Sequence, residues 1–322
     1  MTDSELLNTF GKQYRELKQE MGKVIVGQDK AVDSLLLSIF TGGHCLLVGV
    51  PGLAKTLMVN TLSHALGLSF SRIQFTPDLM PSDITGAEIL DENRKFQFIK
   101  GPVFANIVLA DEINRTPPKT QAALLEAMQE KCVTVSGKSY RLEAPFFVLA
   151  TQNPIEQEGT YPLPEAQLDR FMLNIRIDYP SFEEEVAIVK GTTVDFSQEV
   201  KVVMSAEEIL SYQSVIRRMP VPDNVCEYAV RLASSTRPHG TNDTPATPLA
   251  TKYLSWGAGP RASQYLVMGA KTHAAMKGKY SPDIEDVNAV AEEVLRHRIV
   301  RNYYAEAEGL STEEIIQELI AK

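Results

Sequence analysis

The chain has 322 residues, of which 44% are hydrophobic and 23% are charged, an ordinary globular composition. This length suggests two domains and supplies enough apolar side chains for a large core. The formal net charge of −9 and the isoelectric point near 5.2 argue against a strongly basic nucleic-acid binder.

The N-terminus and the cysteines indicate the compartment. The first residues are polar and acidic and lack the apolar core of a signal peptide, and no apolar run approaches the roughly 20 residues that span a bilayer. Cys45, Cys132 and Cys226 are far apart and form no Cys-x-x-Cys pair, as expected of reduced thiols. We therefore expect a cytoplasmic protein that does not insert into a membrane.

Apolar periodicity and turn residues predict the elements of the first half in chain order. Helices are expected over residues 5–20 and 29–40, followed by a strand over 44–48, a glycine-rich turn and a helix to about residue 67. A strand is expected over 70–75, a helix over 120–131, and hairpins over 84–100 and 132–142. The continuous apolar runs 106–110, 146–150 and 171–177 are typical of strands buried on both faces of a parallel sheet.

Helical signals replace strand signals after residue 180. Capping boxes pair Ser181 with Glu184, Ser205 with Glu208 and Ser311 with Glu314, and Ser281 before Pro282 predicts another helix start. No strong strand run follows residue 203, and residues 237–248 are expected to form a loop. The sequence therefore predicts an α/β domain over residues 1–180, with helices around a parallel sheet, and a helical domain over residues 181–322.

The segment Gly49-Val50-Pro51-Gly52-Leu53-Ala54-Lys55-Thr56 has the layout of a phosphate-binding loop, because a strand precedes it and a helix follows it. Backbone N–H groups of such a loop surround phosphates, and the positive end of the helix dipole points at them. We expect Lys55 to reach the terminal phosphates and the Thr56 hydroxyl to hold Mg²⁺. Ala54 departs from the general pattern, which has glycine before the lysine. The predicted ligand is a nucleoside triphosphate.

Polar side chains follow two of the predicted buried strands, at the edge where open α/β sheets bind ligands. Asp111 is expected to hold Mg²⁺ through its water shell, and Glu112 to orient and deprotonate an attacking water. Asn153 is a candidate to hydrogen-bond the γ-phosphate or that water, although an Asn-Pro pair alone is usually a turn.

Other polar residues have structural alternatives. Arg170 precedes the third buried strand, where a guanidinium would stabilise the charge that develops in phosphoryl transfer; alternatively it forms a surface salt bridge with Asp169 or a neighbour. Trp256, the only tryptophan, is interpreted as packing the helical domain or an interface. The basic cluster Arg296, His297, Arg298 and Arg301 is interpreted as a solvated helix face.

Taken together, Gly49–Thr56, Asp111-Glu112, Asn153, Arg170 and Gly259-Pro260-Arg261 occur in the order of an AAA+ ATPase, and their spelling resembles the MoxR family. The distinctive stretches are the loop itself, residues 101–129, residues 150–154 and residues 163–171, and the likeness covers almost the whole chain. Ala54 matches the spelling usual in this family.

The resemblance implies a nucleotide-binding core with a parallel central sheet, an all-α lid domain, and Mg²⁺-dependent hydrolysis of ATP. It implies that the adenine is flanked by residues that include Val26, Gly27 and Gln28, and that the phosphates are bound by Gly49, Pro51, Gly52, Leu53, Ala54, Lys55, Thr56 and Leu57. Asn153 corresponds to sensor 1, Arg170 to an arginine finger that acts on a neighbouring subunit, and Arg261 to sensor 2. The hairpins at 84–100 and 132–142 resemble the helix-2 insert and the pre-sensor 1 hairpin, which face a central pore or a partner.

Members of this family are thought to form hexameric rings that remodel or mature partner proteins, often proteins with a von Willebrand factor A domain. A ring-forming remodelling ATPase, with a homo-oligomer and a protein client as partners, is therefore the leading hypothesis. The alternatives are a nucleic-acid motor, against which the acidic balance weighs, and the motor subunit of a metal chelatase. A nucleotide-gated scaffold would not need Glu112, and a small-molecule kinase would not need Asn153 or Arg170.

Overall fold

The computed structural model describes residues 2–90, 92, 94–155, 159–193, 199–241 and 245–321. The chain forms two compact units, each of which gathers segments that are distant in the sequence. We call residues 13–163 and 175–211 the sheet unit, and residues 1–12, 164–174 and 212–322 the helical unit. Because the chain enters each unit more than once, the units do not follow one cut in the sequence, and the domain boundary at residue 180 stays a prediction.

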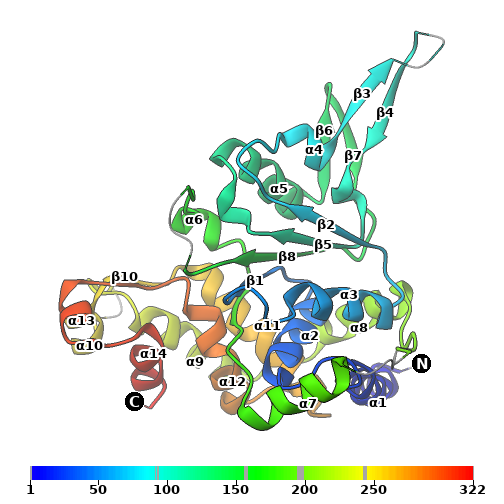
Figure 1. Ribbon diagram of the computed structural model, residues 1–322. Helices are drawn as coiled ribbons and strands as arrows, with labels where there is room; N and C mark the ends of the chain where they lie inside the picture. The colour runs from blue at the N-terminus through cyan, green and yellow to red at the C-terminus, as the bar shows by residue number, and fades with distance from the viewer. Residues whose placement is uncertain are drawn as a thin grey trace. The chain divides into compact units, whose positions relative to one another are not determined.

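A five-stranded sheet lies at the centre of the sheet unit, in the order β2-β5-β8-β1-β9 (Figure 1). Its strands are β1 (Cys45–Val48), β2 (Phe70–Gln74), β5 (Ile107–Asp111), β8 (Phe147–Gln152) and β9 (Leu173–Arg176). β5 and β8 pair in parallel, from Ile107 opposite Phe147 to Ala110 opposite Ala150. Residues 107–110 are fully buried, so the continuous apolar run forms a strand covered on both faces, as predicted.

Helices cover both faces of this sheet, with α5 (Pro118–Glu130) on one side and α2 (Asp29–Thr41) and α3 (Lys55–Ala65) on the other (Figure 1). The unit also contains the single turns η1 (Pro102–Phe104) and η2 (Ile113–Arg115), and the helix α7 (Phe182–Thr192), which begins at the predicted capping box. Two helices, α1 (Asp3–Gly22) and α8 (Ala206–Arg218), and the strand β9 have residues in both units. The predicted α/β fold with a parallel sheet is confirmed.

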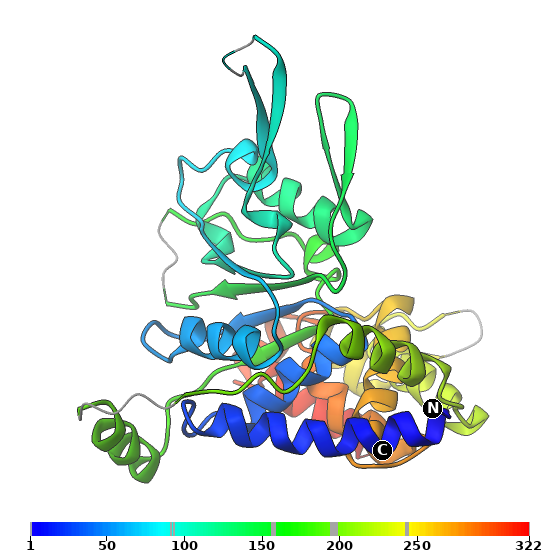
Figure 2. The ribbon, with the colours of Figure 1, turned by 90° about the vertical axis from the view of Figure 1, so that its right-hand side faces the viewer.

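Two antiparallel hairpins project from the same side of the sheet unit (Figure 2). They are β3 (Gly86–Leu90) with β4 (Phe96–Lys100), and β6 (Cys132–Val135) with β7 (Lys138–Arg141). The rings of Phe98 and Tyr140 stack with centroids 4.1 Å apart, so each hairpin supports the other. The first hairpin begins two residues later than predicted, because Pro81–Thr85 forms the short helix α4. Residues 91 and 93 of its turn lie outside the described residues.

The helical unit is built mainly from α9 (Asp223–Ser235), α11 (Pro260–Met276), α12 (Ile284–Leu295) and α14 (Thr312–Ile320). Its shorter elements are α6 (Glu165–Leu168), α10 (Pro248–Tyr253), β10 (Leu254–Trp256), β11 (Val300–Arg301) and α13 (Tyr303–Ala307). α11 and α12 approach closely at Gly269, where a Cβ would lie 3.1 Å from Cγ2 of Val290. Within the described ranges, no helix combines the length and apolarity needed to cross a membrane.

Two details of the helical unit differ from prediction. β10 and β11 form a two-stranded antiparallel sheet in a region predicted to be entirely helical. The helix predicted to start at Ser281-Pro282 starts at Ile284 instead, because the carboxylates of Asp283 and Asp286 form the capping box with the opposite backbone N–H groups. The other capping boxes, at residues 181, 205 and 311, form as predicted.

Candidate functional site

The loop between β1 and α3 has three residues whose backbone explains its shape. A Cβ at Gly49 would lie 2.7 Å from the carbonyl oxygen of Ile177, so no larger residue fits there. Gly52 has a φ of 87°, in the left-handed region that glycine enters without strain. Ala54 caps α3 with a φ of 55° and a ψ of 22°, which is also left-handed. The alanine therefore adopts the conformation for which the general loop pattern uses glycine.

Lys55 lies at the first turn of α3 and folds back over the loop. Its Nζ donates a hydrogen bond of 2.5 Å to the carbonyl oxygen of Gly49. Burial lowers the pKa of Lys55 below its usual value, while the negative charges of Asp111 and Glu112 act in the opposite direction. The ammonium group is thus held near two carboxylates.

Thr151, at the end of β8, joins the two acids at the end of β5. Its hydroxyl donates to Oδ1 of Asp111 at 2.7 Å and accepts from the backbone N–H of Glu112 at 2.8 Å. Glu112 has a φ of 58°, so the chain turns sharply after the strand. This left-handed turn is unusual for glutamate and costs energy, and the Thr151 hydroxyl helps to fix it. The Asp111 carboxylate and the Glu112 backbone are therefore held at defined positions before any ligand binds.

Arg72 and Gln74, on β2, complete this edge of the sheet. Arg72 Nη2 lies 2.7 Å from Asp111 Oδ2, and Gln74 Nε2 donates to Glu112 Oε2 at 3.2 Å. Arg115 adds an ion pair of 3.2 Å to the same glutamate oxygen. The sequence analysis assigned no role to Arg72, Gln74 or Thr151. The alternation of side chains along β2 could have indicated Arg72 and Gln74. Residues 72 and 74 share one face of the strand near its carboxyl end, where the two acids of β5 are also expected.

These residues line one cavity of about 460 Å³ in the sheet unit. The lining includes Pro51, Gly52, Ala54, Lys55, Thr56 and Leu57 from the loop and α3, and Arg72, Gln74, Asp111, Glu112 and Asn153 from the strand ends. Asn153 is nearly buried, and its Oδ1 accepts a hydrogen bond from the Ile155 backbone. The structure therefore brings the predicted loop, acids and asparagine together, and adds Arg72 and Gln74.

The segment predicted to flank the adenine does not line this cavity. Gly27 has a φ of 73°, and a Cβ there would lie 2.7 Å from Cδ of Glu184. Gln28 Nε2 donates to the carbonyl oxygen of Asp178 at 2.9 Å. Val26 lies in the same short connection and is half-buried. These contacts fix the connection against residues 178–184 of the same unit.

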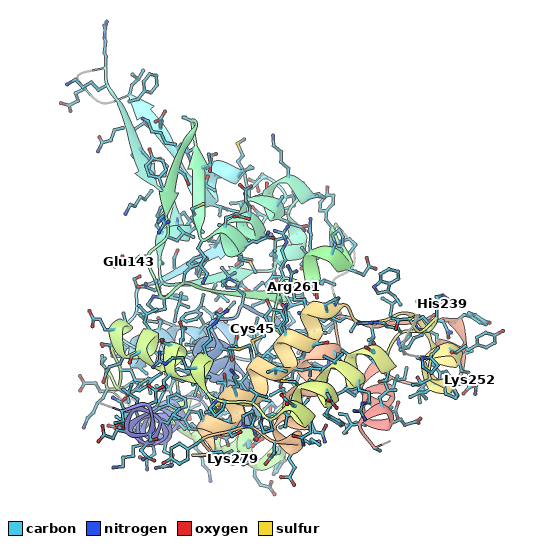
Figure 3. All side chains as sticks on the ribbon, turned by 180° about the vertical axis from the view of Figure 1, so that it is seen from behind. Cys45, Glu143, His239, Lys252, Arg261 and Lys279 are labelled. Atoms are coloured by element: carbon cyan, nitrogen blue, oxygen red, sulfur yellow. The ribbon has the colours of Figure 1, made fainter. Side chains whose placement is uncertain are left out.

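Arg170 and Arg261 both belong to the helical unit, where Asp169 contacts Arg261 and directly precedes Arg170 in the chain. Arg261, at the start of α11 (Figure 3), donates to Asp169 Oδ2 at 3.1 Å. Arg170 follows Asp169 directly and is half-buried. The carboxylate of Asp169 is therefore committed to Arg261, and on its other oxygen to Arg298 at 2.7 Å.

The prediction that the basic cluster at residues 296–301 is a solvated helix face is wrong. Arg298 is buried and directs all five N–H donors at oxygens: Nε at Asp169 Oδ1, Nη1 at the carbonyls of Met172 and Val294, and Nη2 at those of Asp169 and Phe171. His297 Nε2 bonds the Phe171 carbonyl at 2.9 Å. Arg296 pairs with Glu292 and Glu313. The cluster therefore holds residues 169–174 by hydrogen bonds to their backbone carbonyl groups and to the Asp169 carboxylate.

Comparison with known proteins identifies the family. A family model described as "ATPase family associated with various cellular activities (AAA)" matches residues 44–173, and an AAA lid domain model matches residues 247–319. Chaperone MoxR1 of Mycobacterium tuberculosis is 44% identical over 305 residues, which cover 94% of this chain and 79% of that protein. The chain belongs to the MoxR family of AAA+ ATPases.

Other relatives and a solved structure are similar over most of the chain. YeaC of Bacillus subtilis is 41% identical, with 94% of this chain and 92% of that protein covered. Protein MoxR of Methylorubrum extorquens is 30% identical, with coverage of 88% and 86%. The crystal structure of a candidate ATPase from Cytophaga hutchinsonii superposes with a TM-score of 0.90 at 44% identity, and covers 99% of this chain and 96% of that one.

Proposed function

We propose that the sheet-unit cavity binds ATP with Mg²⁺ and that its residues catalyse hydrolysis of the bond to the terminal phosphate. The observation that carries this proposal is the pair of hydrogen bonds made by the Thr151 hydroxyl. One hydroxyl bonds both the Asp111 carboxylate and the Glu112 backbone N–H, beside a cavity that Lys55 and Thr56 also line. An incidental pair of strand-end acids would not need a buried side chain to hold both of them beside a lysine.

The oxygen donors of the cavity fit Mg²⁺. The Thr56 hydroxyl and the Asp111 carboxylate line the same space, and phosphate oxygens and water would complete the octahedral shell that this ion requires. Bound Mg²⁺ would neutralise charge on the β- and γ-phosphates. Arg72 now occupies one oxygen of Asp111 and is itself about half exposed, so it is free to turn toward a phosphate.

The remaining cavity residues have separate roles in binding the phosphate, accepting the proton and orienting the reacting groups. Lys55 would exchange its bond to the Gly49 carbonyl for one to a phosphate oxygen, which is a stronger, charge-assisted bond. Glu112 would accept the proton of the attacking water, and Asn153 would orient that water or the γ-phosphate. Gln74 and Arg115, which contact Glu112, would hold its carboxylate in position.

Arg170 and Arg261 supply positive charge from the helical unit. Arg261 donates a hydrogen bond to Asp169, and Asp169 directly precedes Arg170 in the chain. This proximity supports a joint action of the two guanidinium groups. We assign Arg170 to the nucleotide of a neighbouring copy, because a finger in trans makes hydrolysis depend on assembly. A homo-oligomeric ring, with a hexamer as the expected size, follows from this assignment.

The biological role is remodelling of a protein partner. The name of Chaperone MoxR1, at 44% identity, supports this role, and the two projecting hairpins of the sheet unit offer a surface for a partner. A client with a von Willebrand factor A domain and a cytoplasmic location are parts of the same proposal.

The Glu112→Gln variant tests the proposal. It keeps the size and shape of the side chain but removes the base, so steady-state hydrolysis should fall by about 100-fold or more while ATP still binds. Glu126→Gln, the same change on the exposed face of α5, is the matched control and should hydrolyse ATP normally.

Normal turnover by Glu112→Gln would remove this residue from the base role. The ATP-bound variant also serves to capture partners, which can be identified by mass spectrometry. Recovery of nucleic acid alone would contradict the remodelling role and would favour a nucleic-acid motor.

A further inference from the structure

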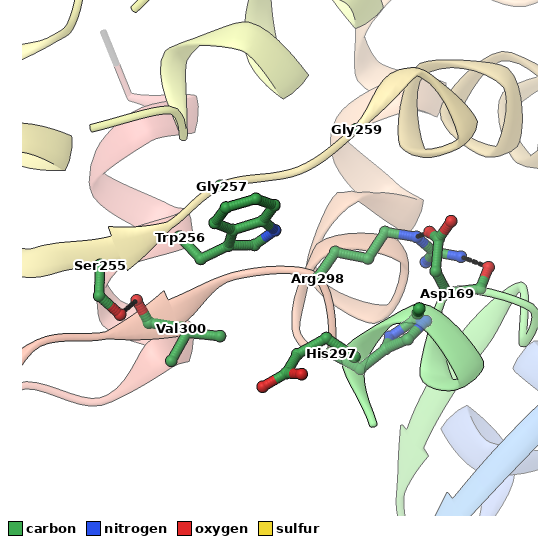
Figure 4. A pocket seen from close by; sticks show the side chains of 10 residues that line it. Asp169, Ser255, Trp256, Gly257, Gly259, His297, Arg298 and Val300 are labelled. Atoms are coloured by element: carbon green, nitrogen blue, oxygen red, sulfur yellow. Dashed lines mark hydrogen bonds and ion pairs between the residues drawn. The ribbon is translucent and has the colours of Figure 1, made fainter. Parts of the chain in front are cut away.

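A second cavity, of about 650 Å³, lies within the helical unit (Figure 4). It is lined by residues of β10 and of the segment after it on one side and by the segment from His297 to Val300 on the other, with Asp169 at one end. None of the proposed steps of ATP hydrolysis uses this space. Its size is that of a site for a small ligand or for a few residues of a peptide.

The charged groups at the inner end of this cavity are already satisfied. Arg298 directs all five of its N–H donors at protein oxygens, and the two oxygens of Asp169 accept from Arg298 and Arg261. Arg298 cannot donate to a ligand without breaking these bonds, so it forms a rigid end wall. The Asp169 carboxylate, which is about one-third exposed, keeps lone pairs that can accept a further hydrogen bond.

Two further ionisable side chains line the cavity, those of His297 and Glu165. His297 uses Nε2 as the donor to the Phe171 carbonyl, so Nδ1 is left as an acceptor, and that buried atom has no partner among the described residues. Burial and the positive charge of Arg298 hold the pKa of His297 well below its usual value, so the ring stays neutral at physiological pH. Glu165 is exposed at the start of α6 and adds a carboxylate that no hydrogen bond or ion pair holds within the described chain.

The other wall is aromatic and exposed. Trp256 is 65% exposed and pairs across the short sheet with Val300, and both residues line the cavity. Tyr303 and Tyr304, which begin α13 one residue after β11, are 78% and 64% exposed. Exposed aromatic side chains in one region are typical of protein interfaces. Trp256 therefore does not pack into the interior of the helical unit.

We propose that this cavity is a docking site for another protein and that it receives an arginine side chain of that partner. The guanidinium group fits, because it carries several N–H donors and no acceptor, while the exposed carboxylate of Glu165 is an acceptor that no group of the described chain occupies. Its flat face and aliphatic stem pack on the indole of Trp256. A phosphate or another anionic ligand is disfavoured by the carboxylate of Glu165 and by the absence of a free donor on Arg298.

Trp256 also provides the measurement, because it is the only tryptophan in the chain and its emission reports on this wall directly. The full-length protein is titrated, without nucleotide, with the peptide acetyl-Gly-Arg-Gly-amide. The same peptide with citrulline, the neutral isostere of arginine, is the matched ligand. The arginine peptide should change the emission saturably with a dissociation constant on the order of 1 mM, and the citrulline peptide should bind at least tenfold more weakly.

Variants locate the site. Glu165→Gln should weaken the arginine peptide at least fivefold, whereas Glu285→Gln, the same change at an exposed position of α12, should leave binding unchanged. Trp256→Phe supplies the emission blank, and circular dichroism checks that each variant is folded.

Three results would overturn the proposal: equal binding of the two peptides, unchanged binding by Glu165→Gln, or no saturable change up to about 10 mM peptide. Emission that depends on protein concentration but not on peptide would identify a second copy of this chain as the occupant instead. Because no nucleotide is present, failure of this test would leave the assignment of ATP hydrolysis intact.

Discussion

The sheet unit and the helical unit each contain an arginine–aspartate pair with an N–O distance of 2.7 Å, yet the two pairs have opposite properties. The guanidinium of Arg72 is 48% exposed and contacts Asp111 and Gln74 at the rim of a cavity. That of Arg298 is 2% exposed and has every donor engaged. An open pair can rearrange when a ligand arrives, whereas a closed pair fixes the chain. Exposure and donor saturation, rather than distance, distinguish a candidate site from a structural anchor.

Arg298→Met gives the sharpest contrast between these pairs. The change leaves Asp169 partly uncompensated and strips hydrogen bonds from four buried or partly buried carbonyl groups, so the free energy of unfolding should fall by about 3–5 kcal/mol. Arg72→Met, the matched change at the open pair, should lower it by less than about 1 kcal/mol. Urea unfolding followed by circular dichroism measures both, and equal losses would invalidate the distinction.

Buried histidines extend the comparison to pH. His44, in the sheet unit, uses both nitrogens: Nε2 bonds the Met128 carbonyl and Nδ1 accepts from the Val148 backbone. Burial is the main cause that lowers its pKa to about 4. A proton therefore binds the unfolded chain, with a usual pKa near 6.5, more readily than the folded one. Stability from this group is complete above pH 6.5 and is lost as the pH falls toward 4.

For His44 this linkage corresponds to about 2 kcal/mol between pH 7.5 and pH 5. The free energy of unfolding, measured at both pH values, should depend less on pH in His44→Gln than in the unsubstituted protein. His239→Gln, at an exposed position, should retain the full dependence. If all three proteins show the same dependence, His44 is not the group that titrates.

Ala54→Gly tests a smaller effect in the open site. Glycine removes the left-handed strain at this position, but it also increases the entropy of the unfolded chain, so stability should rise by only about 0.5 kcal/mol. Ala122→Gly, at an exposed position with ordinary helical geometry in α5, should instead lose about 1 kcal/mol. Thermal unfolding of the two variants gives the comparison, and a loss of stability at residue 54 would show that its conformation carries no strain.

The sequence predicted the parts of the site that follow local rules. A glycine-rich turn between strand and helix, and polar residues after buried strands, are short patterns, and parallel strands bring their carboxyl ends to one edge. Thr151 and Arg72 were missed because their importance lies in contacts with Asp111, about 40 residues away along the chain. Reading the alternation of β2 would have found Arg72, but nothing local distinguishes Thr151 from other strand threonines.

The basic cluster at residues 296–301 shows most clearly what cannot be predicted from a local sequence pattern. Arg296, His297 and Arg298 follow a helix with a polar face, so local pattern favours a solvated surface. Their partners are carbonyl groups near residues 171–174, more than 120 residues earlier in the chain. Backbone carbonyls have no signature in the sequence, so an arginine that binds them cannot be told from one that faces water.

The two glycines of the phosphate loop constrain the chain in unrelated ways. Gly52 is required by its backbone angle, and that requirement lasts only as long as the loop must keep a shape suited to phosphates. Gly49 is required by the carbonyl oxygen of Ile177, the residue that follows β9, whatever the loop binds. A descendant of this protein that had lost ATP binding would be free to replace Gly52 and Lys55, but it would keep Gly49. Glycine at position 49 alone is therefore evidence of the fold, and only together with Lys55 is it evidence of the activity.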